Sequence, residues 1–243
     1  MEDKVYENYK KFAKEYKLKN TDIKRLWQII KPICEHKEFI KRCDKPYFHH
    51  DLKMLGDHIL CDAILTYKLI KKVKKESKKV RVDIAVLIAM FHDLYEEPWQ
   101  NVFIQKDFPN KHGFTHPIEA IVNAITWYPN YFENKEKAMI IIDGVVHHMF
   151  PLPVRAIDDK FMDLNNNEKY EKLNDKYKQM IKLSTDIGKI GHYSIRKSFF
   201  IEGRIMSKAD KIVALRKDLG SLSGYLALLG AKNKNLPTNK KSS

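Results

Sequence analysis

Imidazole and carboxylate side chains recur at positions of this chain that we expect to face the protein core. They are His58, His92, Asp93, His148 and Asp210, each on or beside an apolar helix stripe. A buried, unpaired carboxylate is costly. Two carboxylates and three imidazoles facing the core would be costlier still unless a cation gathered them. A divalent metal ion is such a cation, so the set indicates a metal site.

Each of these side chains has a simpler interpretation when it is taken alone. A single histidine on an apolar stripe is more often a hydrogen-bonded core residue than a ligand. Asp210 can pair with Lys208 or Lys211 on its own helix. His147 and His148 point about 100° apart on a helix, so at most one of them faces inward, and His148 fits the stripe. The prediction of a metal site therefore depends on the whole set.

Helices must position these side chains, because apolar residues recur at spacings of three and four and clear strand alternation is absent. We expect helices at about 21–42, 52–76, 82–94, 135–149, 166–184 and 197–218, and one that begins at His116 with Pro117 in its first turn. The first is a single helix or a pair kinked at Pro32, with Asn20-Thr21-Asp22 as candidate caps. These elements predict an all-α protein.

We expect one helical bundle with a helical insertion before its last core helix. Residues 1–45 are predicted to form an N-terminal helical extension packed on the core, and residues 46–218 to form the main domain. A polar, lysine-rich stretch at 158–195 is interpreted as an insertion or lid. Residues 219–243 are predicted to be a disordered, basic C-terminal tail.

The composition, with 44% hydrophobic and 31% charged residues, is that of a soluble globular protein. No window approaches the roughly 18 apolar residues of a membrane span, and the N-terminal stretch carries no secretory signal. Cys34, Cys43 and Cys61 form no CxxC pair, so we expect neither a disulfide framework nor a cysteine-based zinc site. We therefore expect a cytoplasmic protein without a membrane partner.

The net charge of +14, from 45 basic and 31 acidic residues, attracts polyanions such as nucleic acids and nucleotides. Much of this charge is lysine scattered along helix faces, for example in the run from Lys71 to Lys79. Such runs are usually solvated surface. A compositional bias and a functional basic face both remain open at this point.

The ordered set resembles the HD superfamily of helical, metal-dependent phosphohydrolases, whose pattern is H…HD…D. The pattern corresponds here to His58, to FHDL at 91–94 and to SKADKI at 207–212. Two further runs, HGFTHPIEAIVNA at 112–124 and VVHHMFPLP at 145–153, are similar to those of a bacterial subgroup of predicted HD hydrolases. The resemblance covers about residues 46–218 and implies an HD-domain helical bundle.

The resemblance also implies the ligands of one or two divalent metal ions. His58, His92, Asp93 and Asp210 would bind one ion, and His116 and His148 a second, with Asp93 as the bridge between them. Imidazole and carboxylate ligands suit Mn²⁺, Fe²⁺, Co²⁺, Ni²⁺ or Zn²⁺. Asp93 would thereby serve catalysis as well, because such a site activates water for attack on phosphorus.

Other side chains have expected roles around these ligands. Lys211 is a candidate for stabilising charge on the phosphate, and Lys111 and Arg204 are candidates for substrate binding. His112 is a candidate proton donor. The residues expected to support the metal-binding histidines are His50, Asp62 and His147. For Asp62 the two open interpretations are that it orients the imidazole of His58 and that it pairs with a nearby lysine.

The predicted function is hydrolysis of a phosphomonoester or phosphodiester, with a nucleotide as the expected small phosphorylated substrate. Members similar to HD-GYP proteins carry HDIGK, whereas this chain has HDLYE with Glu96 at the lysine position, and it lacks the later GYP run. These departures weigh against cyclic di-GMP as the substrate. The alternative is a non-catalytic or regulatory protein on the same scaffold that binds nucleic acid or a nucleotide.

Overall fold

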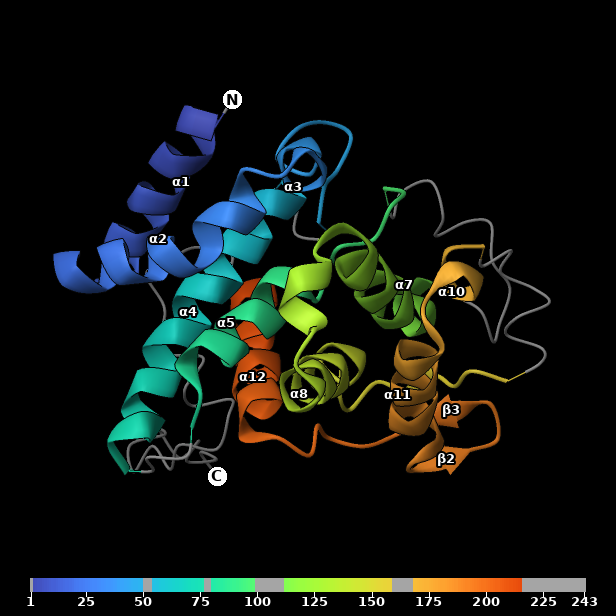
Figure 1. The fold of residues 1–243 in the computed structure, drawn as a ribbon. Coiled ribbons are helices and arrows are strands. Elements are labelled where there is room, and N and C mark those ends of the chain that lie inside the picture. The colour runs from blue at the N-terminus through green and yellow to red at the C-terminus, as the bar shows by residue number, and fades with distance from the viewer. Residues whose placement is uncertain (1, 50–53, 77–79, 99–111, 159–167, 216–243) are drawn as a thin grey trace, which may run out of the picture.

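Helices dominate the computed structural model, which describes residues 2–49, 54–76, 80–98, 112–158 and 168–215 (Figure 1). The longer helices are α1 (Glu2–Glu15), α2 (Asn20–Cys34), α4 (Leu55–Glu76), α5 (Val82–Phe91), α7 (His112–Trp127), α8 (Lys135–Val146), α11 (Asp175–Asp186) and α12 (Ile201–Leu215). The shorter ones are α3 (Lys37–Lys41), α10 (Glu168–Lys172) and the 3-10 helix η1 (Pro129–Phe132). The prediction of an all-α protein is confirmed. Within the described residues, no helix combines the length and the apolar character that crossing a membrane requires.

Helix α5 occupies the centre of the core. Every residue from Ile84 to Phe91 is buried. The helix carries no polar side chain after Asp83, so neighbours must cover it on all sides. Helices α2, α4, α8 and α12 pack against it (Figure 1). The helix ends at Phe91, which leaves His92 and Asp93 just beyond its last turn, still inside the core.

The N-terminal helices pack on this core, α1 against α4 and α2 against α5. The helix predicted at 21–42 is not divided at Pro32, because α2 continues through Pro32 to Cys34. The break falls at His36, whose ring accepts a hydrogen bond from the Glu38 amide and so caps α3. The predicted caps of α2 also differ, since Lys19 precedes the helix and its side chain makes no capping hydrogen bond.

Helix α7 begins at His112, one turn earlier than predicted. Pro117 therefore lies inside the helix rather than at its first position. The backbone carbonyl of His112 accepts a hydrogen bond of 3.0 Å from Nδ1 of His116. Because residues four apart share a helix face, the earlier start places the two histidines next to each other on one side of α7.

A small antiparallel sheet, which the sequence did not indicate, joins the two ends of the predicted insertion. Its order is β1 (Val154–Arg155), β3 (Tyr193–Ser194) and β2 (Lys189–Ile190). Ser194 pairs with Val154 on one side and with Lys189 on the other. Each strand has two residues, which is too short for an alternating pattern to appear in a sequence.

The single helix predicted at 166–184 is two helices, α10 and α11. The chain leaves the helical conformation after Lys172 and resumes it at Asp175. Asn174 caps α11, because its side-chain oxygen accepts a 3.0 Å hydrogen bond from the Lys176 amide. The break is difficult to recognise in the sequence of this polar, lysine-rich stretch, because asparagine also occurs on exposed helix surfaces.

Helix α12 reaches the core by a close crossing over α8. A Cβ on Gly203 would lie 2.8 Å from Cα of Gly144 and 2.5 Å from Oγ of Ser198, so only glycine allows this approach. The crossing lets α12, the red-orange helix of Figure 1, contact α4, α5 and α8 together. The crossing thereby brings Asp210, which lies late in the sequence, next to helices that lie much earlier in the sequence. The tail predicted at 219–243 lies outside the described residues.

A buried carboxylate fixes the segment that leads into α12. Asp143 of α8 accepts hydrogen bonds from the Ser198 hydroxyl at 2.7 Å and the Phe199 amide at 2.8 Å. It also accepts from the Arg196 guanidinium at 2.5 Å. Hydrogen bonds to a charged group are stronger than those between neutral groups. Asp143 therefore holds the beginning of α12, and with it the register in which its side chains meet the core.

Candidate metal centre

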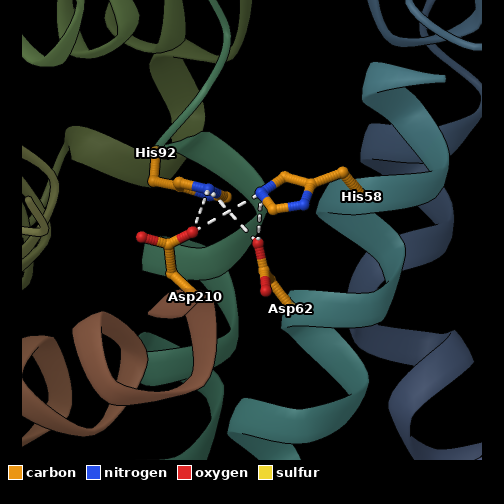
Figure 2. Close-up of side chains that lie close together, drawn as sticks. All are labelled: His58, Asp62, His92 and Asp210. Atoms are coloured by element: carbon orange, nitrogen blue, oxygen red, sulfur yellow. Dashed lines mark ion pairs between the residues drawn. The ribbon is translucent and has the colours of Figure 1, made fainter. Parts of the chain in front are cut away.

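Three parts of the fold bring ionisable side chains to one buried point. Helix α4 supplies His58 and, one turn later, Asp62, because residues four apart lie on the same helix face. The turn after α5 supplies His92 and Asp93, and α12 supplies Asp210. Figure 2 shows the two side chains of α4 facing His92 and Asp210.

The first group consists of His58, Asp62, His92 and Asp210, whose ligand atoms all lie within 4.8 Å of one another. His58 Nε2 is 2.9 Å from Asp62 Oδ2 and 3.5 Å from Asp210 Oδ1 (Figure 2). His92 Nε2 is 3.3 Å from Asp62 Oδ2. Both carboxylate oxygens of Asp62 and both of these Nε2 atoms are buried and make no hydrogen bond with the described residues. Buried polar atoms without a hydrogen bond are rare, and a bound cation satisfies them.

Asp93 connects this group to a second one. Its Oδ1 lies 3.5 Å from His116 Nε2 and 3.7 Å from His148 Nε2, and these three residues form the second group. Its Oδ2 lies 3.5 Å from His92 Nε2 and 3.8 Å from His58 Nε2. One carboxylate thus faces both groups, with a different oxygen toward each, as a bridging carboxylate can.

Hydrogen bonds to the backbone set the tautomers of three of these histidines. The bonds run from His92 Nδ1 to the Ala89 carbonyl at 2.7 Å, from His116 Nδ1 to that of His112 at 3.0 Å and from His148 Nδ1 to that of Val145 at 2.7 Å. A carbonyl oxygen only accepts hydrogen bonds, so Nδ1 carries the hydrogen in each ring. When these rings are neutral, each therefore presents the lone pair of Nε2 to the other side chains of its group, as a metal-binding imidazole does.

The two imidazoles of the second group face each other through those lone pairs. His116 Nε2 lies 3.2 Å from His148 Nε2. Burial lowers the pKa of His148 to about 3, and it also lowers the pKa of His116. Both rings are therefore neutral at physiological pH, and no proton lies between the two nitrogens. Two lone pairs at this distance repel each other, and a cation between them turns the repulsion into attraction.

Two carboxylates of the site, Asp93 and Asp210, stay ionised in spite of their burial, whereas burial raises the pKa of Asp62. Burial acts to raise the pKa of Asp93, but nearby histidines, with His92 the largest contributor, outweigh it and hold this pKa well below its usual value. The pKa of Asp210 is lowered in the same way, against its burial, by the nearby histidines. Negative charge at these positions favours a divalent cation.

His49 belongs to the site although the sequence analysis did not select it. Its ring stacks on that of His58, with centroids 3.5 Å apart and planes within 10°. Its Nε2 lies 3.9 Å from Asp93 Oδ2, and His49, His58 and Asp93 form a third group of candidate ligands. The sequence shows an adjacent pair, His49-His50, and the supporting role was expected for His50 rather than for His49. His50 lies outside the described residues, and a loop has no periodicity to show which neighbour faces inward.

Asp62 lies beside His58, as one of its two interpretations expected, and the ring nitrogen that it faces bears on its role. A carboxylate that orients a metal-binding histidine accepts a hydrogen bond from the ring nitrogen remote from the metal. Asp62 instead faces Nε2 of both His58 and His92, on the side where the ligand atoms converge. No lysine of the described chain lies within ion-pair distance of it. This position makes Asp62 a candidate ligand.

A cavity of about 480 Å³, here called the metal cavity, opens beside the second group. Asp93, His116 and His148 lie on its wall, together with His112 and Lys211. The rest of the wall is mostly apolar and includes Tyr95, Met149, Pro151, Leu152, Ala214 and Leu215. A small molecule in this cavity would touch the metal-binding side chains at one end and an apolar surface elsewhere.

The remaining predicted residues lie elsewhere or outside the described chain. Arg204 and His147 line a neighbouring cavity rather than the metal cavity. The His147 ring bonds to the Ser184 carbonyl at 3.0 Å, and burial, with the charge of Arg196, lowers its pKa to about 4. Lys111, predicted to bind substrate, lies outside the described residues.

Comparison of this chain with protein-family models, with curated proteins and with solved structures finds no significant match. The interpretation of the site therefore depends on its own geometry. That geometry shows buried histidine and aspartate groups that can hold a metal ion.

Proposed function

We propose that this protein is a metal-dependent phosphohydrolase that cleaves a phosphomonoester or phosphodiester of a small organic molecule, with nucleotides as the expected class. The observation that carries the proposal is the group formed by His58, Asp62, His92 and Asp210. It concentrates imidazoles and carboxylates in the core, with buried atoms that no hydrogen bond satisfies. It lies next to the second group, which lines a cavity of suitable size for a small ligand.

The donor set fits a transition metal better than a hard cation. Imidazole nitrogens together with carboxylate oxygens suit Mn²⁺, Fe²⁺, Co²⁺, Ni²⁺ or Zn²⁺, whereas Ca²⁺ prefers oxygen ligands alone. The first group would hold one ion, and Asp93, His116 and His148 a second. A divalent ion in such a site, when bound, activates water and polarises phosphate oxygens.

Two side chains of the metal cavity have chemistry that suits a phosphate ester. Lys211 is half-buried, and its Nζ donates a 2.7 Å hydrogen bond to the Ser207 hydroxyl, which orients the ammonium group. Its positive charge would stabilise the charge that develops on the phosphate oxygens. His112 lies one turn before His116 on the same wall and would donate a proton to the leaving oxygen.

The apolar part of the wall suits the organic portion of such a substrate. Tyr95 contributes an aromatic ring to the wall. Leu152 and Leu215, on the same wall, are 50% and 66% exposed. Burying these surfaces under a planar base or another apolar group removes them from water. The cavity therefore favours an organic phosphate over inorganic phosphate alone.

The test is phosphate release by protein that is loaded with Mn²⁺, Zn²⁺ or Fe²⁺ and offered mono-, di- and cyclic nucleotides. Asp93→Ala should reduce turnover at least about 100-fold, because it removes the carboxylate shared by both groups. The matched control is Asp83→Ala, which removes an exposed carboxylate from the other end of α5. No release from any substrate would refute the proposal. Salt-dependent RNA binding that survives Asp93→Ala would then favour the non-catalytic alternative.

A further inference from the structure

A second cavity of about 370 Å³ lies directly beside the metal cavity. Pro151 and Lys211 belong to the walls of both cavities, so they form the partition between them. We call it the basic cavity, because its wall carries Lys197, Arg204, Lys208 and Lys211. The proposed hydrolysis takes place in the metal cavity and gives no role to three of these four cations.

Helix periodicity explains how these cations come to face one space. Arg204, Lys208 and Lys211 follow one another at spacings of four and three on α12, so they share one helix face. Lys197 joins them from the segment that Asp143 ties to α8. Asp210 is turned toward the metal centre instead, so α12 presents Asp210 to the metal site and its basic stripe to the basic cavity.

No carboxylate of the described residues forms an ion pair with any of these four cations. Two other cations of the described chain do have such partners, since Arg196 pairs with Asp143 and Lys169 pairs with Glu96. Like charges that gather without a counter-charge repel one another. An anion in the cavity would relieve this repulsion.

Neighbouring groups hold three of the cations in place. Lys211 donates to the Ser207 hydroxyl at 2.7 Å, and Arg204 donates to the Phe199 carbonyl at 2.6 Å. The ammonium group of Lys197 lies 5.4 Å from the centre of the Phe150 ring. Each contact uses only part of the donor capacity of its side chain. The cations are thus partly ordered before any ligand binds, which reduces the entropy lost on binding.

A chain of two hydrogen bonds connects the basic cavity with the metal centre. The Ser207 hydroxyl, which accepts from Lys211, donates to the backbone carbonyl of His148 at 2.5 Å. His148 is a member of the second metal-binding group. Because Lys211 lines both cavities, a ligand that reaches across it would contact both sites at once.

We propose that the basic cavity is a second anion-binding subsite and that the ligand of this protein is an organic molecule with two separate phosphate groups, one for each cavity. The assignment of the first phosphate to the metal cavity rests on the proposed function, whereas the anion site itself does not. The preferred ligands are then organic bisphosphates, such as nucleotides phosphorylated at two positions of the sugar.

The shape of the site favours a small ligand over a nucleic acid. The cations converge on one cavity of about 370 Å³. A protein that binds a nucleic acid backbone instead spreads its cations along a groove that follows the strand. The apolar wall of the neighbouring metal cavity also suits one base or similar group rather than a continuous strand.

The first experiment measures binding of inorganic pyrophosphate to the full-length, metal-free protein by titration calorimetry. The test variant is Lys197→Ala/Lys208→Ala, which removes two exposed cations of the basic cavity and leaves Lys211 in place. The matched control is Lys14→Ala/Lys24→Ala, which removes two exposed lysines of α1 and α2. We expect the test variant to bind pyrophosphate at least about tenfold more weakly and the control to bind it like the wild type. Equal binding by all three proteins would overturn the proposal.

The second experiment compares adenosine 5′-monophosphate with adenosine 3′,5′-bisphosphate on metal-loaded protein. The bisphosphate should bind at least about tenfold more tightly to the wild type, and the test variant should lose this preference. A preference that survives in the test variant would refute the second subsite. A short RNA that binds more tightly than the bisphosphate and loses the same factor in the test variant would overturn the small-ligand assignment.

The two proposals fail in different ways. If the pyrophosphate titration behaves as expected while no nucleotide is hydrolysed, the hydrolase function is refuted and the anion site stands. If phosphate is released normally but the Lys197→Ala/Lys208→Ala variant binds pyrophosphate like the wild type, the hydrolase function stands and the second subsite is refuted.

Discussion

Replacing Asp62 by asparagine distinguishes two roles for this residue, that of a metal ligand and that of a side chain that only supports the histidines. Asp62→Asn keeps the shape of the side chain and an oxygen that accepts hydrogen bonds, but it removes the negative charge. Oδ2 of Asp62 lies 2.9 Å from His58 Nε2 and 3.3 Å from His92 Nε2, among the nitrogens that converge on the site. An ion held by those nitrogens would touch this oxygen directly, so we expect the substitution to weaken metal binding strongly.

The size of the effect follows from the position of the carboxylate. Loss of a group that only supports a ligand lowers metal affinity about 10- to 100-fold. Loss of a direct carboxylate ligand should therefore exceed about 100-fold, which corresponds to about 2.7 kcal/mol. For a protein of this size, each kcal/mol shifts Tm by about 2–4 °C. The rise in Tm caused by a fixed metal concentration should therefore be smaller in the variant by about 5–11 °C.

The assay combines chelator-competition titration with calorimetric melting of the metal-free and metal-loaded protein. Each variant is compared with its own metal-free form, which cancels any effect of the substitution on folding itself. Asp83→Asn is the control, because it neutralises an exposed carboxylate at the start of the same α5 that leads to His92. If Asp62→Asn lowers the affinity less than about tenfold and keeps the full rise in Tm, Asp62 is a supporting residue and our assignment is wrong.

Three further predictions concern the fold around the site. His147→Gln should make the stability of the metal-free protein less sensitive to acid. The pKa of His147 is lowered from 6.5 to about 4 on folding. The wild type therefore loses stability as pH falls through this window, at about 1.4 kcal/mol per pH unit. Melting curves across this pH range measure the difference. Gly203→Ala should lower the free energy of unfolding, measured in urea, by about 1–3 kcal/mol, because its Cβ would push α12 off α8. Gly113→Ala is the control and should not destabilise the protein, because a Cβ at that position meets nothing within 4 Å. Arg42→Lys should lower the free energy of unfolding by about 1.5–3 kcal/mol, because the buried guanidinium donates to the Tyr95 carbonyl through both Nε and Nη2. An unchanged midpoint of urea unfolding would contradict this prediction.

Several features of this protein follow from the sequence because they depend on neighbours along the chain. The apolar run at 82–94 predicts a buried helix, and α5 is buried from Ile84 to Phe91. Burying such a helix leaves the following His92-Asp93 pair inside the core, where carboxylates and imidazoles require partners. The stripe positions of His58 and His148 also predict that they face inward, since helix geometry alone decides which residues share a face.

Other features depend on how helix faces meet, which local patterns do not contain. The inward face of α4 carries both His58 and Asp62, and only the approach of His92 and α12 shows that Asp62 faces the converging nitrogens. His49 lies in a loop without periodicity, so its stacking on His58 could be recognised only after the chain had folded.

The basic cavity shows the same division between sequence and tertiary structure. The sequence alone determined that α12 has a basic stripe beside Asp210, because the spacing of Arg204, Lys208 and Lys211 is a property of one helix. A run of lysines has the same appearance whether it is solvated or lines a cavity. The close crossing at Gly203 and the bonds to Asp143 place this stripe next to Lys197 and the metal cavity. Only tertiary structure decides such contacts, because they join residues that are far apart in the chain.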